Sequence, residues 1–408
     1  MEIRPILSAM LRAKTAPLLI AAQVALTLAI VCNALYIIQD RMATAARPSG
    51  VDEQNLSEIR FYPHRPIGDI KGMQMQDLEA IRAIPGVVSA SWVNQVPMAR
   101  SGWSVGGLTT EPGQPPSNIN AAQYFSGDSV VETFGLELVQ GRDFLPSEVI
   151  ESDPEKDRNQ AQAVIITQAL ANLLWPDEAT VIGKTMFLGG GDGASPLQVV
   201  GVVASLQTPW AQTSPAHQNS LILPIRYLDP FTRYAVRTEP GRRDQVMAEV
   251  EKALVALRND RVLLSNRTFS QIREQRYAGE RLMAGLLTAV TGFLLLITAS
   301  GIVGMASLWV NQRRKQIGVR RAIGARKADI LRYFLVENLM ITTAGIAVGL
   351  AMAVGLNNFL VSELDLPRLP VAYLGLTMVG MWVLGLLAVL GPAWRAAAVP
   401  PAIATRTA

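Results

Sequence analysis

Residues 311–332 read NQRRKQIGVRRAIGARKADILR, and this segment lies between two long uncharged stretches. It carries eight basic residues and a single acid, Asp329. Short loops that are rich in Lys and Arg stay on the cytoplasmic side of a membrane. The segment therefore predicts a cytoplasmic loop between two membrane spans, and this loop sets the orientation of the whole chain.

Four windows of the chain contain no Asp, Glu, Lys or Arg. They are residues 15–39, 282–312, 338–362 and 369–394, with lengths of 25, 31, 25 and 26 residues. A helix needs about 20 apolar residues to cross a membrane, whereas apolar runs of about 10–14 residues are more typical of buried core helices. We predict four transmembrane helices, at residues 16–39, 284–311, 333–361 and 371–393.

The charges that flank these windows predict the side of each loop. Arg4, Arg12 and Lys14 precede the first span, and Arg395 and Arg406 follow the fourth, which predicts that segments 1–15 and 394–408 are both cytoplasmic. The loop at 362–370 has two acids and one arginine, as expected of an outer loop. The first apolar stretch is longer than that of a signal peptide, which favours an uncleaved anchor.

Composition indicates a membrane protein with a sizeable soluble part. Hydrophobic residues make up 50% of the 408 residues and charged residues only 17%. Much of the net charge of +4 comes from the loop at 312–332, so it indicates topology and gives no support to nucleic-acid binding. The only cysteine, Cys32, lies in the first span, so the extracytoplasmic region must fold without an internal disulfide.

The extracytoplasmic region, residues 40–268, begins and ends with similar strand–helix–strand patterns. In the first, at 40–97, a helix places Met75, Leu78, Ile81 and Ile84 on one face; in the second, at 229–268, a helix places Val246, Val250, Leu254 and Leu257 on one face. We predict that these two βαβ-type units pair into one α/β domain, and that residues 98–228 form an inserted β-rich lobe.

The stretch from Phe269 to Gln312 contains no proline and predicts one long helix. Its charged first part, 269–283, is expected to project from the membrane as a stalk that continues into the second span. A break near Gly279 or Gly285 is the alternative, because glycine makes a bend easy.

Motifs for catalysis are poor in this chain. Gly102–Gly106 has the spacing of a nucleophile elbow but is followed by turn-like sequence. Gly183-Lys184-Thr185 resembles the end of a Walker A motif, yet Glu178 stands where its first glycine is required. With only His64 and His217, neither a catalytic base nor a zinc site is predicted. We expect a non-enzymatic protein without a cofactor or metal.

Small residues at helical spacing mark packing faces in two spans. Gly345 and Gly349 form one such pair, and Ser300 and Gly304 form another; each could pack helices within the chain or form a dimer seam. Glu337 lies near one end of the third span, where an acid is a candidate functional residue or simply reaches the interface.

The segment QIGVRRAIGARKADILRYFLVENLMITTAGIAVGL resembles the signature of the MacB/FtsX family of ABC-transporter permeases. The phrases DLEAIRAIPGVVSAS, VVETFGLELVQGRDF and AVIITQALANLLWPDEATVIGKTMFLG, followed by LQVVGVV, resemble the MacB-type periplasmic core domain in the same order. The four-span plan is also similar, so the resemblance covers nearly the whole chain.

The resemblance implies a dimeric permease of the bacterial inner membrane, made of two copies or of two paralogues, that works with separate cytoplasmic ATPase subunits. It also implies that a periplasmic adaptor, an outer-membrane channel and membrane lipids are candidate partners. A coupling helix would dock on the ATPase through Gln316, Ile317, Gly318, Arg320, Arg321, Ala322, Ile323, Gly324 and Ala325. Ile317 and Ile323 are expected to form its apolar edge. Family loops often carry a glutamate where this chain has Gln316. The chain therefore lacks one charge that could form an ion pair with the ATPase.

We therefore expect a MacB-like permease that couples ATP hydrolysis in a partner to movement of its periplasmic domain, for export of a periplasmic or membrane-extracted substrate. Two alternatives stay open, an FtsX-like signal relay to a cell-wall hydrolase and a lipoprotein-release permease.

Overall fold

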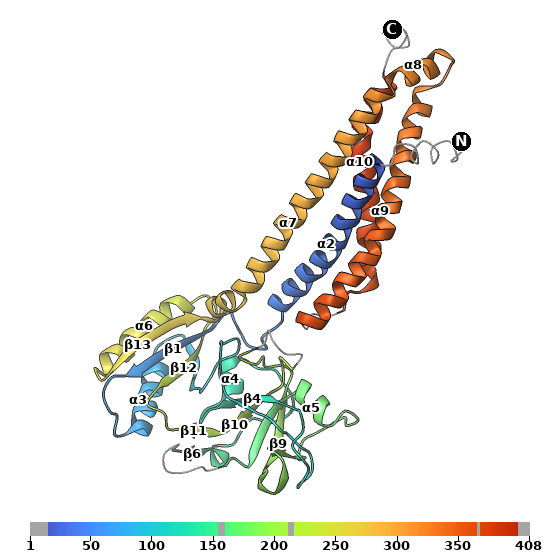
Figure 1. Cartoon of the computed structure of the whole chain (residues 1–408). Helices are drawn as coiled ribbons and strands as arrows, with labels where there is room; N and C mark the ends of the chain where they lie inside the picture. Colours follow the sequence, from blue (N-terminus) through green and yellow to red (C-terminus); the bar gives the residue numbers. More distant parts are fainter. Residues whose placement is uncertain (1–14, 154–159, 211–215, 365–367, 399–408) are drawn as a thin grey trace. The chain divides into compact units, whose positions relative to one another are not determined.

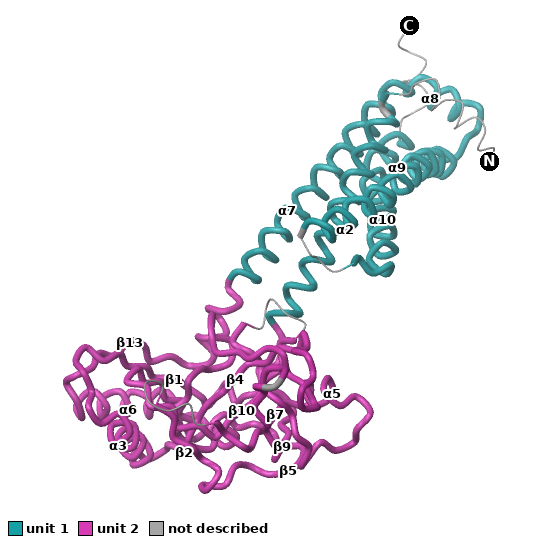
Figure 2. Tube along the Cα trace, turned by 60° about the horizontal axis from the view of Figure 1, so that its bottom comes forward, with its two compact units in different colours: residues 1–45, 279–408 teal, residues 46–278 magenta. Residues whose placement is uncertain are grey.

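The computed structural model (Figure 1) describes residues 15–153, 160–210, 216–364 and 368–398. The chain divides into two compact units (Figure 2): unit 1 comprises residues 1–45 and 279–408, and unit 2 comprises residues 46–278. Several charges used to predict the topology lie outside the described residues, namely Arg4, Arg12, Lys14, Asp365 and Arg406.

Unit 1 is helical. Four described helices are long and apolar enough to cross a membrane, which confirms the predicted class of membrane protein. They are α2 (Thr15–Ala45), α7 (Phe269–Gln312), α9 (Lys327–Leu364) and α10 (Val371–Ala397). The short helix α8 (Arg314–Ala322) connects α7 with α9.

Polar side chains join the helices of unit 1. Asn33 on α2 donates from Nδ2 to the carbonyl of Ala353 on α9 at 3.1 Å. The hydroxyls of Thr27 and Thr298 lie 2.7 Å apart and join α2 to α7. Hydrogen bonds of this kind contribute to helix association in lipid, where no hydrophobic force acts between helices. They explain why these polar residues occur within apolar windows.

Unit 2 contains a four-stranded antiparallel sheet in the order β13-β1-β12-β2. Strand β1 leads through α3 to β2, and β12 leads through α6 to β13. Strand β12 lies between β1 and β2, and β1 lies between β12 and β13, so the strands of the two units alternate in one sheet. The two strand–helix–strand units therefore pair into one domain, as predicted. The bounds are β1 (Leu56–Pro63), α3 (Ile70–Arg82), β2 (Val87–Trp92), β12 (Thr232–Thr238), α6 (Arg243–Leu257) and β13 (Arg261–Thr268).

Three of the four residues predicted on the buried face of α6, Val246, Val250 and Leu254, are in the core, and Leu257 is half-buried. The prediction for α3 is wrong at Met75, which is 47% exposed, whereas Met73 is buried. The reason is a buried polar residue on this face: Asp77 accepts hydrogen bonds from the Arg261 guanidinium and the Tyr234 hydroxyl.

The inserted lobe is β-rich, as predicted. Its seven-stranded sheet has the order β3-β4-β10-β7-β9-β5, with β8 beside β9. The strands are β3 (Ser104–Val105), β4 (Ala121–Phe125), β5 (Leu138–Gly141), β7 (Ala163–Thr167), β8 (Thr185–Leu188), β9 (Ser195–Val203) and β10 (Ser220–Leu223). Strands β6 (Ile150–Ser152) and β11 (Ile225–Tyr227) pair separately. Short helices α4 (Val130–Phe134) and α5 (Gln168–Leu174), with 3₁₀ turns at Pro146–Glu148 and Gly191–Gly193, complete the lobe.

Helix α7 is continuous from Phe269 to Gln312, so the predicted long helix forms without a break at either glycine. Its first turns belong to unit 2, where Phe269, Ile272 and Tyr277 are buried. The Tyr277 hydroxyl accepts a hydrogen bond from Nε2 of Gln207 at 2.6 Å. The beginning of the predicted stalk therefore packs into unit 2.

Candidate functional site

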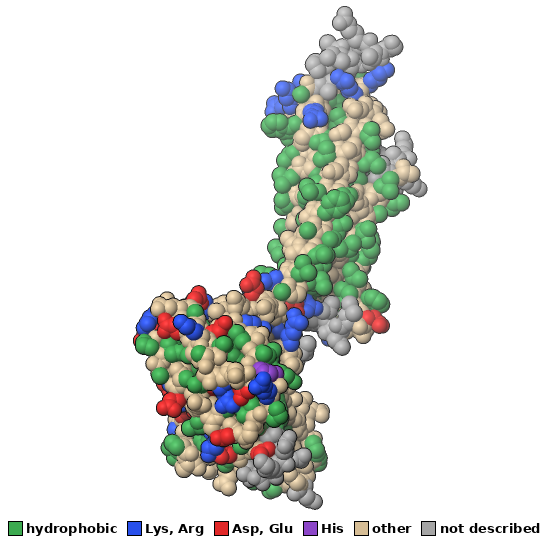
Figure 3. Space-filling model, turned by 90° about the vertical axis from the view of Figure 1, so that its left-hand side faces the viewer, with side chains coloured by type: hydrophobic (Ala, Val, Ile, Leu, Met, Phe, Trp, Pro, Cys, Tyr) green, Lys and Arg blue, Asp and Glu red, His purple; other side chains and the backbone are tan. Residues whose placement is uncertain are grey.

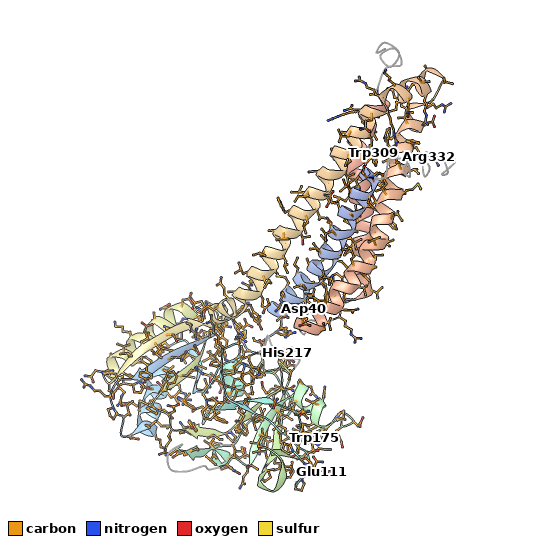
Figure 4. All side chains as sticks on the ribbon, viewed as in Figure 1. Asp40, Glu111, Trp175, His217, Trp309 and Arg332 are labelled. Atoms are coloured by element: carbon orange, nitrogen blue, oxygen red, sulfur yellow. The ribbon has the colours of Figure 1, made fainter. Side chains whose placement is uncertain are left out.

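Most basic residues of unit 1 gather at one end of its helices. Figure 3 shows Lys and Arg side chains at that end, while the length of the helices is covered mainly by hydrophobic side chains. Trp309 on α7 and Arg332 on α9 lie toward the same end, and Asp40 on α2 lies at the opposite end (Figure 4). The basic end is therefore built from α8 and the adjoining turns of α7 and α9.

Glycine ends α8 in the expected way. Gly324 has a φ of 104°, a left-handed conformation that favours glycine. The Gly324 amide donates to the carbonyl of Arg321 at 3.2 Å, and the Ala325 amide donates to the carbonyl of Arg320 at 3.0 Å. These bonds satisfy carbonyls at the helix end. Helix α9 begins three residues later, at Lys327, so Gly324 provides the sharp reversal between the two helices.

The inner face of α8 anchors it to unit 1. Ile317 is 5% exposed and belongs to the apolar core that includes Ile330 and Phe334 of α9. Gly318 is also buried. A hollow of about 30 Å³ between Ile317 and α9 also has Gln316 and Arg320 in its lining.

An ion pair, a hydrogen bond and a cation–π contact add three further ties to the anchor. Glu337, whose side chain is only 1% exposed, lies 2.9 Å from Nη1 of Arg313, the residue that precedes α8. The Arg321 guanidinium donates to the carbonyl of Ala397 on α10 at 2.6 Å. The Arg320 guanidinium lies 5.3 Å from the centre of the Tyr333 ring. The predicted intramembrane acid is therefore an ion-pair partner of the loop.

The outer side of α8 has two exposed apolar residues, one within the helix and one at its C-cap. Val319 and Ile323 are 49% and 82% exposed, and their spacing of four places them on the same face of the helix. The predicted apolar edge of Ile317 with Ile323 is wrong, because Ile317 faces the core. Val319 was missed, although its i,i+4 spacing to Ile323 was the available signal. Gln316, Arg320, Ala322 and Gly324 are also exposed, and Ala325 is half-buried.

The glycine pair of α9, Gly345 and Gly349, packs against another helix of the same chain. A β-carbon at Gly345 would lie 2.6 Å from the carbonyl oxygen of Ala21, and one at Gly349 would lie 2.9 Å from the Cα of Ala25. This pair therefore packs α9 against α2, which removes it as a dimer seam. Ser300 and Gly304 on α7 differ, because both are exposed and a β-carbon at Gly304 would meet no described atom within 4 Å.

The residues of the enzyme-like motifs do not assemble. Ser104 lies in the two-residue strand β3, and no helix follows it as a nucleophile elbow requires. Lys184 makes an ion pair with Glu178, the residue that breaks the Walker A pattern. Among the described residues, no group of three or more His, Cys, Asp or Glu side chains could hold a metal ion.

Two family profiles match the chain. The MacB-like periplasmic core domain matches residues 21–253, more than half of the 408 residues. The C-terminal domain of FtsX-like permeases matches residues 288–401. The chain belongs to the MacB/FtsX family of permeases. As a member of this family it is a multi-pass membrane protein with a periplasmic core domain, whose profile covers most of unit 2, and an FtsX-like helical part.

Curated relatives of this permease are similar at low identity. MacB of Neisseria gonorrhoeae, a macrolide export ATP-binding/permease protein, is 28% identical over 75% of this chain and 45% of its own length. MacB of Agrobacterium fabrum is also 28% identical, over 77% of this chain and 48% of its own length. The permease thus spans about half the length of these relatives. A solved permease domain from Porphyromonas gingivalis aligns with a TM-score of 0.28 at 15% identity, covering 49% of this chain and 84% of that domain.

Proposed function

We propose that this chain is the membrane subunit of an ABC transporter, and that α8 is the surface on which a separate cytoplasmic ATPase docks. The observation that carries the proposal is the exposed pair Val319 and Ile323 on a helix that is otherwise anchored to unit 1. Such an apolar pair, with arginines beside it, suits a partner that offers an apolar groove rimmed by acids.

The anchoring of α8 supports a role in transmission. Arg313 ties the start of α8 to Glu337 of α9, and Arg321 ties its end to α10. A displacement of α8 by a bound ATPase is therefore passed to two membrane helices rather than absorbed by a loose loop. Helix α7, which runs without a break from the periplasmic core domain to α8, provides a continuous connection between the two ends.

The proposed orientation places α8 and both termini in the cytoplasm. The basic side chains at the α8 end support it, since loops rich in Lys and Arg are retained inside. Helices α2 and α7 then lead outward to the periplasmic core domain. The relatives are named as macrolide export proteins, so we infer that the chain contributes to export of a periplasmic or membrane-extracted substrate. The proposed machine contains two permease chains.

A single charge on the exposed face tests the docking surface. We expect that Ile323→Asp abolishes co-purification of an ATPase subunit with the tagged chain in mild detergent, because a carboxylate would be desolvated in the contact. The matched control is Val255→Asp, on helix α6 of unit 2, where the residue is 53% exposed. Mass spectrometry identifies the ATPase by its Walker motifs. Equal recovery of that subunit with both variants would reject α8 as the docking site.

The signal-relay and lipoprotein-release alternatives would use the same docking surface. The phenotype of a deletion strain therefore distinguishes them from export. Loss of export is expected as greater sensitivity to toxic compounds in a deletion strain. A strain with normal sensitivity but defective cell separation would point to the relay, and lipoproteins retained in the inner membrane would point to lipoprotein release.

A further inference from the structure

One face of the four-stranded sheet of unit 2 carries charged residues. Ile59 and Phe61 of β1 belong to the apolar core that β1 shares with helices α3 and α6. Successive side chains of a strand alternate, so Glu58 and Arg60 face the other side. Arg267 stands opposite Glu58 in the register of β13 with β1. The second face of the sheet is thus a charged surface inside a domain.

Positive charge on this face exceeds negative charge. Arg233 on β12 stands directly opposite Arg60 on β1, and like charges in this position destabilise a strand pair. Glu58, which is fully buried, accepts a hydrogen bond from Arg267 and lies 3.4 Å from Nε of Arg233. Burial, together with the charges of Arg60 and Arg267, holds the pKa of Arg233 below its ordinary value. Glu58 is therefore shared by two arginines and leaves Arg60 uncompensated.

A cavity of about 200 Å³ lies at this face, entirely within unit 2. Five arginines and one glutamate line it, contributed by the sheet, by the loop at 98–101 and by the first turns of α7; the charged lining residues are Glu58, Arg60, Arg100, Arg233, Arg267 and Arg276. Within the described part of the chain, the side chains of Arg60 and Arg100 form no hydrogen bond or ion pair. Arg60 instead stacks on Phe231, with its guanidinium 5.1 Å from the ring centre.

The loop at 98–101, which lines the cavity, contains a residue in an unusual backbone conformation. Met98 has a φ of 62°, a left-handed value that is uncommon for a residue with a side chain. Its side chain is buried, and its amide donates to the carbonyl of Thr208 within the same inserted lobe. Strained residues of this kind persist only where the surroundings hold them, and they gather at ligand sites.

We infer that this cavity binds a phosphate group. The lining carries five arginines and one glutamate, and this excess of positive charge favours an anion with more than one negative charge. A phosphate monoester carries about −1.5 to −2 charges at pH 7 and three acceptor oxygens, whereas a carboxylate carries one charge and two oxygens. Guanidinium groups also match phosphate geometry with paired hydrogen bonds.

The phosphate group has two possible sources, a soluble phosphate ester and a lipid headgroup. In either case the ligand would lie between the sheet and the first turns of α7, because Gln275 and Arg276 line the same cavity. Binding would therefore brace the start of α7 against the sheet. This inference concerns unit 2 alone and is independent of the proposed ATPase docking.

The test uses the purified full chain in detergent at fixed ionic strength. Calorimetric titration with inorganic phosphate forms one arm, and titration with dihexanoyl phosphatidic acid below its micelle concentration forms the other. Arg100→Ala is expected to weaken binding about tenfold, as removal of one hydrogen-bonding charge does. Arg65→Ala, an exposed arginine outside the cavity lining, is the matched control and should leave affinity unchanged.

Arg60→Ala provides a second variant with the same expected loss. If it fails to fold, Arg100→Ala still decides, because that side chain is exposed. Binding of inorganic phosphate supports a soluble source, and binding of the lipid alone supports a headgroup; both require the loss in Arg100→Ala. Hydrogen exchange of residues 269–278 should slow when the ligand is bound. Absence of binding in both arms, or equal affinity in Arg100→Ala and Arg65→Ala, would overturn the inference.

Discussion

Arg313 and Glu337 form an ion pair between the residue that precedes α8 and the third membrane helix. The carboxylate side chain is 1% exposed and that of the arginine is 23% exposed. An acid at this depth is costly without a partner. The pair accounts for Glu337 within an apolar helix, and it is one of the contacts that hold α8 in position.

A double-mutant cycle measures this contact. Arg313→Ala and Glu337→Ala should each lower the free energy of unfolding in detergent, and their combination should reveal a coupling energy of about 1–2 kcal/mol. Denaturant titration of the four proteins provides the measurement. The control cycle pairs Glu337→Ala with Arg314→Ala, since Arg314 is exposed, and it should show no coupling. A similar coupling in both cycles would mean that the Arg313 contact is unimportant.

Single residues also mark where sequence reasoning failed. Hydrophobic periodicity predicts that Met75 lies on the buried face of α3. In the structure this face carries Asp77, and Met73 is buried in place of Met75. Nothing local to α3 reveals this, because the partner of Asp77 is Arg261, which is 184 residues away. A buried ion pair becomes visible only when both strand–helix–strand units are assembled.

At the scale of elements, the contact between α2 and α9 depends on glycine. A β-carbon at Gly349 would lie 2.9 Å from backbone atoms of Ala25, which cannot move without shifting α2. Gly349→Ala should therefore destabilise the chain by about 1–3 kcal/mol. Gly355→Ala, on the same helix with open space around it, should be neutral or slightly stabilising. Melting temperatures in detergent compare the two, and an unchanged value for Gly349→Ala would refute the close packing.

The elements themselves were largely predictable, whereas their outward-facing residues were not. Charge-free windows identify the membrane helices. Hydrophobic periodicity and turn residues identify α3, α6 and the hairpin of β8 with β9. The outer face of α8 was predicted wrongly because α8 is too short for a clear period and has apolar residues on two sides. Ile317 contacts α9, and this tertiary contact leaves Val319 and Ile323 outward.

The whole chain is predicted to place α8 and unit 2 on opposite sides of the membrane. Single cysteines test this in a Cys32→Ala background: Lys252→Cys on unit 2 and Lys315→Cys on α8, both at exposed positions. An impermeant thiol reagent added to intact spheroplasts should label only Lys252→Cys, and lysis should expose both. Labelling of Lys315→Cys before lysis would contradict the proposed orientation.

The pairing of β1 with β13 has a mechanical consequence for the periplasmic core domain. Ser57 near the start of β1 stands opposite Thr268 at the end of β13, so the polypeptide enters and leaves the domain at neighbouring points. Pulling the two connections apart would load the antiparallel pair in an unzipping direction, which breaks its hydrogen bonds one after another. The ion pair of Glu53 with Arg273, 2.6 Å from Nη2 to Oε1, lies where such peeling would begin. This ion pair would set the force at which β1 and β13 begin to separate.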